Sequence, residues 1–326
     1  SDPFGPYFSE SLFSSKFSSE SFSLFGNFDY FINKSLKFSI GARWENYESQ
    51  YLDSLGESFN PSDKMSGGKI SINKNLSDSS NIFMSIARGF NQGGFNLNLG
   101  LAPESNNNNL YYDPEFLTNY EIGFNSQLFN KMMNVSAVIF YSDRDDQQVL
   151  ISTQVDPMDP NTFSFLTQNA AEGINKGVEL NLDMELSESV YFFSRFGLLQ
   201  TDINNWKSRP DLEGRAQAHA PKKSFALGIN WSITDRASLS IDLVGKSSFY
   251  YSDSHDNQSG SYSLTNINYD YSIGRWTYSI WARNVFDEYY SVRGFYFGNV
   301  APDFQNTLYE RHGDPKHLGF TARYDF

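Results

Sequence analysis

The chain has 326 residues, a formal net charge of −13 and a mean hydropathy of −0.49, yet 17% of its residues are aromatic. The negative charge excludes a nucleic-acid binder, because such proteins gain affinity from lysines and arginines that neutralise phosphates. The lack of cysteine excludes disulfide frameworks and cysteine-based metal sites, and no apolar run approaches the roughly 18–20 residues of a membrane-spanning helix.

Strict alternation of apolar and polar residues predicts β-strands along the whole chain. In 36–45 the even-numbered positions from Leu36 to Trp44 are apolar, whereas the odd-numbered positions are mostly polar. The pattern recurs in 120–128, 178–186, 225–231 and 318–326, and about thirteen such segments follow one another. Burial of the carboxylates on one face would cost too much free energy, so that face must meet water. The carboxylates concerned are Glu121, Glu179, Asp183 and Glu185.

The links between the strands alternate in length. Short links occur near residues 33, 77, 130, 187, 234 and 274, and long links span about 48–64, 91–116, 145–162, 204–219, 252–259 and 288–313. Bacterial outer-membrane barrels sort their links in this way, with short turns in the periplasm and long loops outside the cell. We therefore predict an all-β fold, an antiparallel transmembrane outer-membrane β-barrel with short periplasmic turns and long extracellular loops.

The segment RGFNQGGFN, residues 88–96, begins the longest link and offers groups that could bind a ligand. Arg88 continues the apolar face of its strand, above the lipid-facing band, and two glycines permit a sharp turn. Aromatic side chains near the same end supply contact area. Candidate ligand-binding residues at the extracellular mouth are Arg88, Asn91, Gln92, Phe95, Asn96, Tyr111, Tyr112, Arg293 and Tyr296. The alternatives are that Arg88 contacts lipopolysaccharide phosphate and that the rings form the upper aromatic girdle.

The sequence contains no pattern that predicts catalysis or a metal centre. Its four histidines, at positions 219, 255, 312 and 317, fall in or beside long links and lack metalloprotease spacing. The segment SDRDD, residues 142–146, lacks the glycine and the final glutamate of a calcium loop. We find no Gly-x-Ser-x-Gly elbow, no phosphate-binding loop and no rim Ser–His pair. Catalytic residues and a cofactor are therefore not expected.

Five segments, in chain order, resemble motifs of the TonB-dependent outer-membrane receptor family. They are ARGFNQGGFN (87–96), TNYEIGFNSQLFN (118–130), NAAEGINKGVELNLD (169–183), WARNVFDEYY (281–290) and GDPKHLGFTARYDF (313–326). The last of them ends in Phe326, which shares a face with Phe320 and Tyr324, and this ending resembles the signal that the barrel-assembly machinery reads. Each motif is modest alone, but together they extend across most of the chain.

The resemblance implies a barrel of twenty-two strands around a globular plug. About thirteen strands are visible here, an odd number that does not suit a complete single-chain barrel. Residues 1–326 are therefore expected to be the C-terminal portion of a TonB-dependent receptor β-barrel, with the plug domain and the N-terminal strands absent. The expected location is the outer membrane of a Gram-negative bacterium.

The resemblance also implies a function, that of a receptor that binds a scarce nutrient and imports it with energy coupled through TonB. A ferric siderophore is the best-represented cargo of the family, and cobalamin, haem and oligosaccharide are alternatives. A passive porin or channel is the alternative of a different class. The partners implied are the TonB complex, reached through the missing plug, the barrel-assembly machinery, lipopolysaccharide and the small-molecule cargo.

Overall fold

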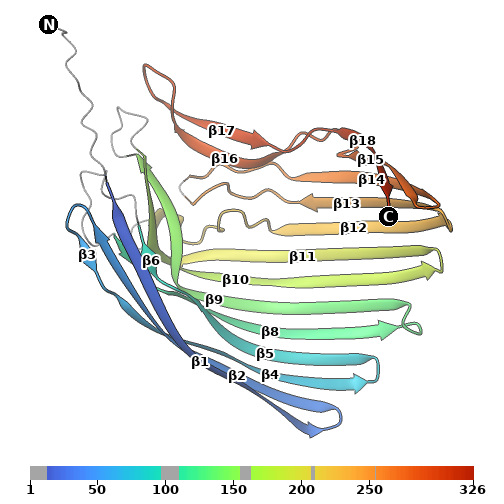
Figure 1. Ribbon diagram of the computed structural model, residues 1–326, viewed down its shortest axis with the longest axis horizontal. Helices are drawn as coiled ribbons and strands as arrows, with labels where there is room; N and C mark the ends of the chain where they lie inside the picture. The colour runs from blue at the N-terminus through green and yellow to red at the C-terminus, as the bar shows by residue number, and fades with distance from the viewer. Residues whose placement is uncertain (1–12, 97–109, 155–162, 207–209, 254) are drawn as a thin grey trace.

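The computed structural model is a single curved β-sheet whose strands run side by side (Figure 1). It describes residues 13–96, 110–154, 163–206, 210–253 and 255–326. The main strands are β1 (Ser15–Asn33), β2 (Leu36–Asp53), β4 (Ser62–Ser77), β5 (Ser80–Asn91), β8 (Glu115–Leu128), β9 (Met133–Gln154), β10 (Phe163–Ser187), β11 (Val190–Asn205), β12 (Lys223–Thr234), β13 (Ala237–Lys246), β14 (Tyr262–Ile273), β15 (Trp276–Arg283) and β18 (His317–Tyr324).

Five shorter strands lie in the links at one end of the sheet, namely β3 (Ser58–Phe59), β6 (Gly94–Phe95), β7 (Tyr111–Tyr112), β16 (Ser291–Gly298) and β17 (Asn306–His312). A single 3₁₀ turn, Pro210–Leu212, is the helical element of the described part. No helix within the described residues is both long enough and apolar enough to cross a membrane.

Each main strand pairs antiparallel with the main strands before and after it. The order runs from β1 through β2, β4, β5 and β8 to β15 and finally β18. Among the described strands, β1 and β18 are the two ends of this order and each pairs with one neighbour only. The predicted all-β antiparallel barrel sheet is confirmed, and its described part is an open arc.

The links are sorted by length, as predicted. Residues 34–35, 78–79, 129–132, 188–189, 235–236 and 274–275 form short turns at one end, which we name the turn end. The remaining links, which include the β16–β17 hairpin, lie at the other end, which we name the loop end (Figure 1). Turns of two to four residues suffice at the turn end because antiparallel neighbours need no longer connection.

The strands extend further toward the loop end than the sequence predicts. The expected loop 48–64 is mostly strand, since β2 runs to Asp53, a tight turn follows in which the Asp53 amide donates to the Glu57 carbonyl at 3.0 Å, and β4 begins at Ser62. In the same way, β9 has 22 residues and β10 has 25, where about 9–11 cross a membrane. Outside lipid both faces of a strand can be polar, so the alternation that marks a strand in the sequence disappears.

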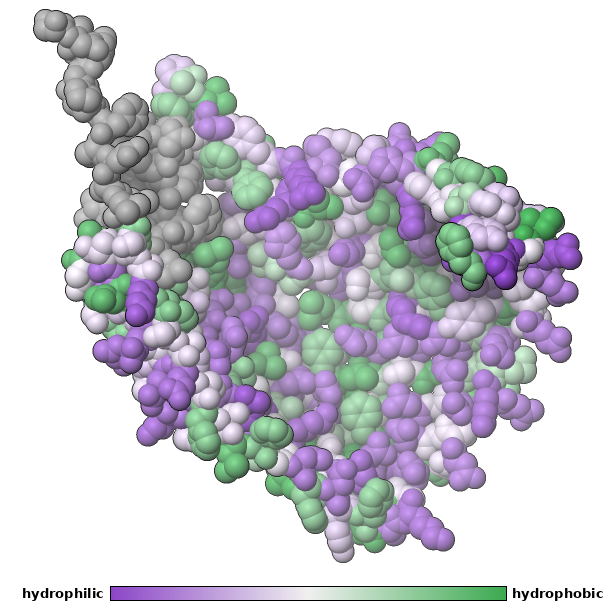
Figure 2. All heavy atoms as spheres, in the orientation of Figure 1, coloured by the Kyte–Doolittle hydropathy of each residue, from purple (hydrophilic) through white to green (hydrophobic). Residues whose placement is uncertain are grey.

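The two faces of the sheet differ as the alternation predicts. Ile40, Ile72, Ile86, Ile122 and Leu180 are all at least 40% exposed, and they lie on the outer face, where lipid would cover them. The inner face is hollowed and carries many hydrophilic side chains, which Figure 2 shows across the concave surface and along the turn end. Asn181, the neighbour of Leu180, lines a pocket on this inner face.

Four aromatic rings of the inner face each lie over a glycine on the adjacent strand. Phe83 covers Gly123, Phe140 covers Gly177, Phe193 covers Gly228 and Trp281 covers Gly319; a Cβ on any of these glycines would meet the ring at 2.0–2.7 Å. The members of each pair are directly opposite in the strand register. The ring fills the space that the glycine leaves, which stabilises a curved sheet where a side chain would not fit.

Candidate functional site

Hydrogen-bonded polar side chains line the inner face. Ser142 Oγ donates to Asn119 Oδ1 at 2.7 Å, Asn119 Nδ2 donates to Glu121 Oε1 at 2.8 Å, and Ser85 Oγ donates to Glu121 Oε2 at 3.3 Å. Nearer the turn end, Arg195 forms an ion pair with Asp183 at 2.6 Å. Glu121 and Asp183, two of the carboxylates that the sequence places toward water, therefore form part of a polar, hydrogen-bonded wall.

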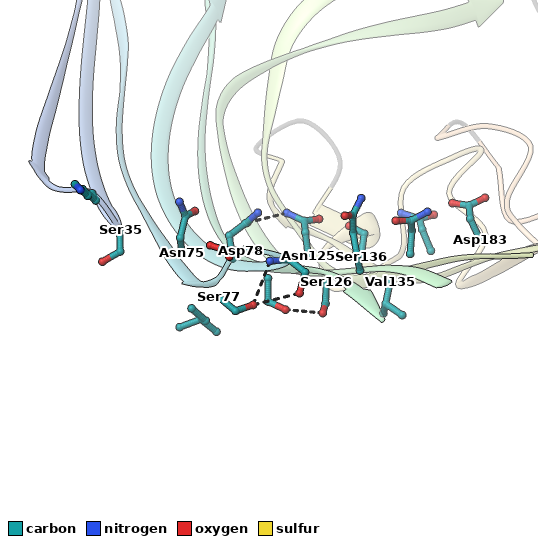
Figure 3. A pocket seen from close by; sticks show the side chains of 17 residues that line it. Ser35, Asn75, Ser77, Asp78, Asn125, Ser126, Val135, Ser136 and Asp183 are labelled. Carbon is teal, nitrogen blue, oxygen red and sulfur yellow. Dashed lines mark hydrogen bonds between the residues drawn. The ribbon is translucent and has the colours of Figure 1, made fainter. Parts of the chain in front are cut away.

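A pocket of about 790 Å³ lies on the inner face at the turn end. In Figure 3, Asn75, Asn125, Ser136 and Asp183 point to the same side from neighbouring strands. Serine and asparagine dominate its lining. Such groups can exchange hydrogen bonds with any polar partner but do not select a charge.

A second pocket, of about 710 Å³, lies nearer the loop end. Its wall includes Glu179, Lys246 and Tyr262 from the main sheet, and Tyr290 and Val292 from the chain that leads into the β16–β17 hairpin. The hairpin base therefore stands beside the inner wall. The sequence alone does not reveal this neighbourhood, because the residues come from links and strands far apart in the chain.

The third pocket, of about 430 Å³, lies beside the segment 88–96. Its centre is Glu45, which is 2% exposed and accepts hydrogen bonds from Ser21 Oγ at 2.8 Å, from Gln92 Nε2 at 2.7 Å and from Arg43, whose Nη2 lies 2.5 Å from Oε2. Gly67 and Gly89 leave room around these groups. The Arg43 side chain remains 48% exposed, so one face of its guanidinium is open to a ligand.

Most of the candidate residues in segment 88–96 are engaged within the protein. Asn91 Nδ2 donates to Gln148 Oε1 at 2.8 Å, and Gln92 Nε2 donates to Glu45 Oε1. Asn96 accepts a hydrogen bond from the Thr167 amide and donates one to the Thr167 carbonyl, both at 2.8 Å, so it pairs with β10 as a strand residue would. These amides fix the link to the wall, which is a positioning role that the sequence does not reveal.

Arg88 lies on the outer face, as its alternation with Met84 and Ile86 predicts. Its Cζ atom is 4.6 Å from the centroid of the Phe116 ring, and its side chain is exposed. Arg88 and Gln92 are nonetheless both among the residues that line the third pocket.

The aromatic candidates of this region form a small core at the loop end. Phe95 stacks on Tyr51 with ring centroids 5.2 Å apart and packs against Tyr111 at 5.4 Å. Tyr111 also donates its hydroxyl to Asp63, and burial raises the pKa of both groups above their ordinary values. The Tyr112 ring lies where a Cβ on Gly94 would be, so this packing needs a glycine at that position. The sharp turn predicted at the two glycines is not formed, since Gly94 begins β6 and neither glycine has a positive φ.

A second loop unit, which the sequence analysis does not anticipate, is centred on Arg215. The guanidinium donates to Asp256 Oδ1 at 2.7 Å and to the Ser252 carbonyl at 2.5 Å, and it lies 4.3 Å from the Tyr250 ring centroid. The Arg215 side chain is only 9% exposed, so the link after β11 and the link after β13 are held together by a buried cation. Nothing in the local sequence marks this contact.

The β16–β17 hairpin packs on that unit. Tyr251 donates its hydroxyl to Glu310 of β17, and its ring occupies the space above Gly294 of β16. The Tyr296 ring lies 5.6 Å from the ring of His255, and burial lowers the pKa of His255 below its ordinary value. The candidates Arg293 and Tyr296 therefore belong to a hairpin that packs with one face on the loop unit around Arg215. The candidates in residues 88–112 belong to a separate cluster of side chains.

The structure corrects one expectation, the lack of a Ser–His pair. Ser291 Oγ lies 3.1 Å from His312 Nδ1, and Tyr289 Oη lies 2.6 Å from Nε2 of the same ring. No carboxylate orients the imidazole in these contacts, and both ring nitrogens are occupied by hydroxyls. Within the described part, no group of three or more His, Asp or Glu side chains could hold a metal ion.

The expected assembly residues lie at the open edge of β18. Phe320 is 65% exposed, Tyr324 37% and Phe326 fully exposed, and the rings of Tyr324 and Phe326 are 5.2 Å apart. This exposed position leaves them accessible to a partner that reads the end of the chain.

Comparison with known proteins decides the family. A family model described as TonB dependent receptor-like, beta-barrel, matches residues 1–285. The chain belongs to this family. The receptor barrel is 24% identical over 263 residues to a ferric-pyoverdine BN7/BN8 receptor of Pseudomonas putida, covering 77% of this chain and 27% of that protein. The matched region contains the first three of the five motifs that carry the resemblance and the first five residues of the fourth.

Solved structures agree on the fold of the TonB-dependent receptor barrel. The ferric yersiniabactin uptake receptor FyuA of Yersinia pestis superimposes with a TM-score of 0.78 at 18% identity, over 96% of this chain and 47% of that one. The siderophore receptor PiuA of Acinetobacter baumannii gives 0.74 at 17% identity, over 94% and 43%. The chain thus spans less than half the length of these relatives, whose names describe siderophore receptors.

Proposed function

We propose that this chain is the C-terminal part of an outer-membrane active-transport receptor that binds a ferric siderophore and imports it with TonB-coupled energy. The family match over residues 1–285 is the observation that carries the proposal. The names of the relatives, which bind ferric pyoverdine and ferric yersiniabactin, support siderophore as the cargo class.

In this proposal the sheet crosses the outer membrane, the loop end faces the outside and the turn end faces the periplasm. The missing strands and a plug come from residues outside this chain, since it covers under half of its relatives. The plug then contacts the polar inner wall and transmits the action of TonB. The barrel-assembly machinery and lipopolysaccharide are the further partners that we propose.

The proposal is tested by uptake of radioactive iron in the native bacterium. A deletion strain grown under iron limitation should lose uptake of at least one ferric siderophore, and the complete gene should restore it. A protonophore, which collapses the energy supply of TonB, should abolish the restored uptake. Uptake that persists with the protonophore would instead indicate a passive channel, and purified protein would then show steady conductance in planar bilayers.

A further inference from the structure

Two arginines of the β16–β17 hairpin stand directly opposite each other. The strand register pairs Arg293 of β16 with Arg311 of β17. Side chains directly opposite on antiparallel strands lie on the same face with Cβ atoms about 4.5–5.5 Å apart, and like charges in that position destabilise the pair. Both side chains are exposed. The hairpin therefore holds two cations close together, and their electrostatic repulsion destabilises it.

The described residues do not neutralise these charges. None of the ion pairs in the described part includes Arg293 or Arg311. The adjacent carboxylate, Glu310, alternates to the opposite face, where it accepts the hydroxyl of Tyr251. The chain as a whole has a net charge of −13, so two arginines in register without an ion-pair partner form a local region of positive charge.

Aromatic rings lie on the same face of the hairpin as the two arginines. The Arg293 Cζ atom lies 4.8 Å from the centroid of the Phe295 ring, and Phe295 is itself paired in register with Tyr309. The Tyr309 ring lies 5.1 Å from that of Phe297. A guanidinium that stacks on a ring keeps its planar edge free for a bidentate contact with an oxyanion. The face thus offers cations and apolar contact area together.

The position of the hairpin connects this face with the cargo path. Gly294 and Tyr296, on the other face, are held by Tyr251 and His255, so the arginine face is turned away from the fixed loop unit. Val292, the neighbour of Arg293, lines the pocket of about 710 Å³ on the inner wall. The strand that carries Arg293 therefore begins beside that pocket, although the two arginines do not themselves line it.

We propose that Arg293 and Arg311 form an anion-binding site that receives the charged oxygens of an iron chelate, so that the receptor selects anionic ferric chelates over electroneutral ones. This inference rests on the proposed function and specifies its substrate class. Catecholate or carboxylate oxygens at the surface of the chelate meet the paired guanidinium groups, and the chelate's aromatic or apolar parts meet Phe295. Binding relieves the repulsion between the two arginines.

The test uses the intact receptor in detergent and two probes, an anionic ferric tris-catecholate and an electroneutral ferric tris-hydroxamate. Fluorescence quenching should give tighter binding of the anionic probe. The double variant Arg293→Gln/Arg311→Gln should weaken that binding by about tenfold or more, since hydrogen bonds between charged groups are among the strong ones. Arg311→Lys keeps the charge but loses the planar guanidinium with its parallel donors. Its affinity for the anionic probe should lie between those of the wild type and the double variant. Arg236→Gln, at the turn end, is the matched control.

Hydrogen exchange of the hairpin amides separates this site from merely solvated surface arginines. The anionic probe should slow exchange in β16 and β17 of the wild type but not of the double variant. Unchanged affinity and exchange in the double variant, or a preference for the electroneutral probe, would overturn the anion site alone. Failure of the intact receptor to bind or import any ferric chelate would overturn the proposed function and this site with it.

Discussion

Gln92 donates its Nε2 proton to the buried Oε1 of Glu45 at 2.7 Å, although 47 residues separate them. This bond joins the link at the mouth of the barrel to the inner wall. Glu45 also accepts hydrogen bonds from Arg43 and Ser21, so one carboxylate holds β1, β2 and the start of the link after β5 in place.

We predict that Glu45→Ala destabilises the barrel by about 1–3 kcal/mol, because it removes a buried carboxylate that accepts hydrogen bonds from Ser21, Arg43 and Gln92. The measurement is the temperature at which the folded band disappears in heat-modifiability gels. Glu48→Ala, which removes an exposed carboxylate three residues further along β2, should change this temperature little. Equal shifts for the two variants would show that burial of Glu45 contributes nothing.

We predict that Gly177→Ala impairs folding, because the new Cβ would lie 2.2 Å from the Leu198 carbonyl oxygen and 2.7 Å from the Phe140 ring. Overpacking of this kind costs about 1–3 kcal/mol. Gly89→Ala is the matched control, since nothing lies within 4 Å of a Cβ at that position. Urea titration of both variants in lipid vesicles measures the difference, and a Gly177→Ala barrel as stable as the control would contradict the close approach.

The outer and inner faces differ in their tolerance of charge. Leu180→Arg places a cation in the lipid-facing band and should reduce the amount of folded protein in the membrane, at a cost of about 2–4 kcal/mol near the midplane. Asn181→Arg places the same side chain in the polar pocket and should be tolerated. The folded fraction in outer-membrane preparations measures both, and equal folding of the two variants would refute the assigned faces.

The contact between His255 and Tyr296 should depend on pH. Burial, and then the nearby Arg215, lower the pKa of His255, whereas Asp256 opposes this shift. A group whose pKa is lowered by folding contributes stability at pH values above its pKa in the unfolded chain. It loses that contribution as the pH falls. Below about pH 6.5, the ordinary histidine value, protonation should loosen the loop after β13. Limited proteolysis at residues 247–260 measures this, and His255→Phe should remove the pH dependence while keeping a ring.

Alternation alone predicts the strands, their facing and the sorting of the links, because lipid and water impose different side chains on the two faces. Leu180 and Asn181 illustrate how directly that pattern predicts the structure. Beyond the lipid band the same constraint is absent, and the extension of β2 to Asp53 is not predicted.

The contacts at the loop end also lie outside what the sequence can predict. Arg215 and Asp256 are 41 residues apart, and Tyr251 and Glu310 are 59 apart. No local pattern links such residues, because packing between loops decides their pairing. Of the candidate ligand residues, Asn91, Gln92 and Asn96 proved to be engaged within the protein, whereas the partner of Arg293 became visible only through the register of β16 and β17.

Because each main strand after β1 pairs with the main strand before it in the chain, no pairing in the described sheet joins strands that are distant in the strand order. The entropy lost on closing each hairpin is correspondingly small, and such a topology favours addition of one hairpin after another over a search for distant partners. With this order of addition, the edges of β1 and β18 that no described strand covers would be paired last.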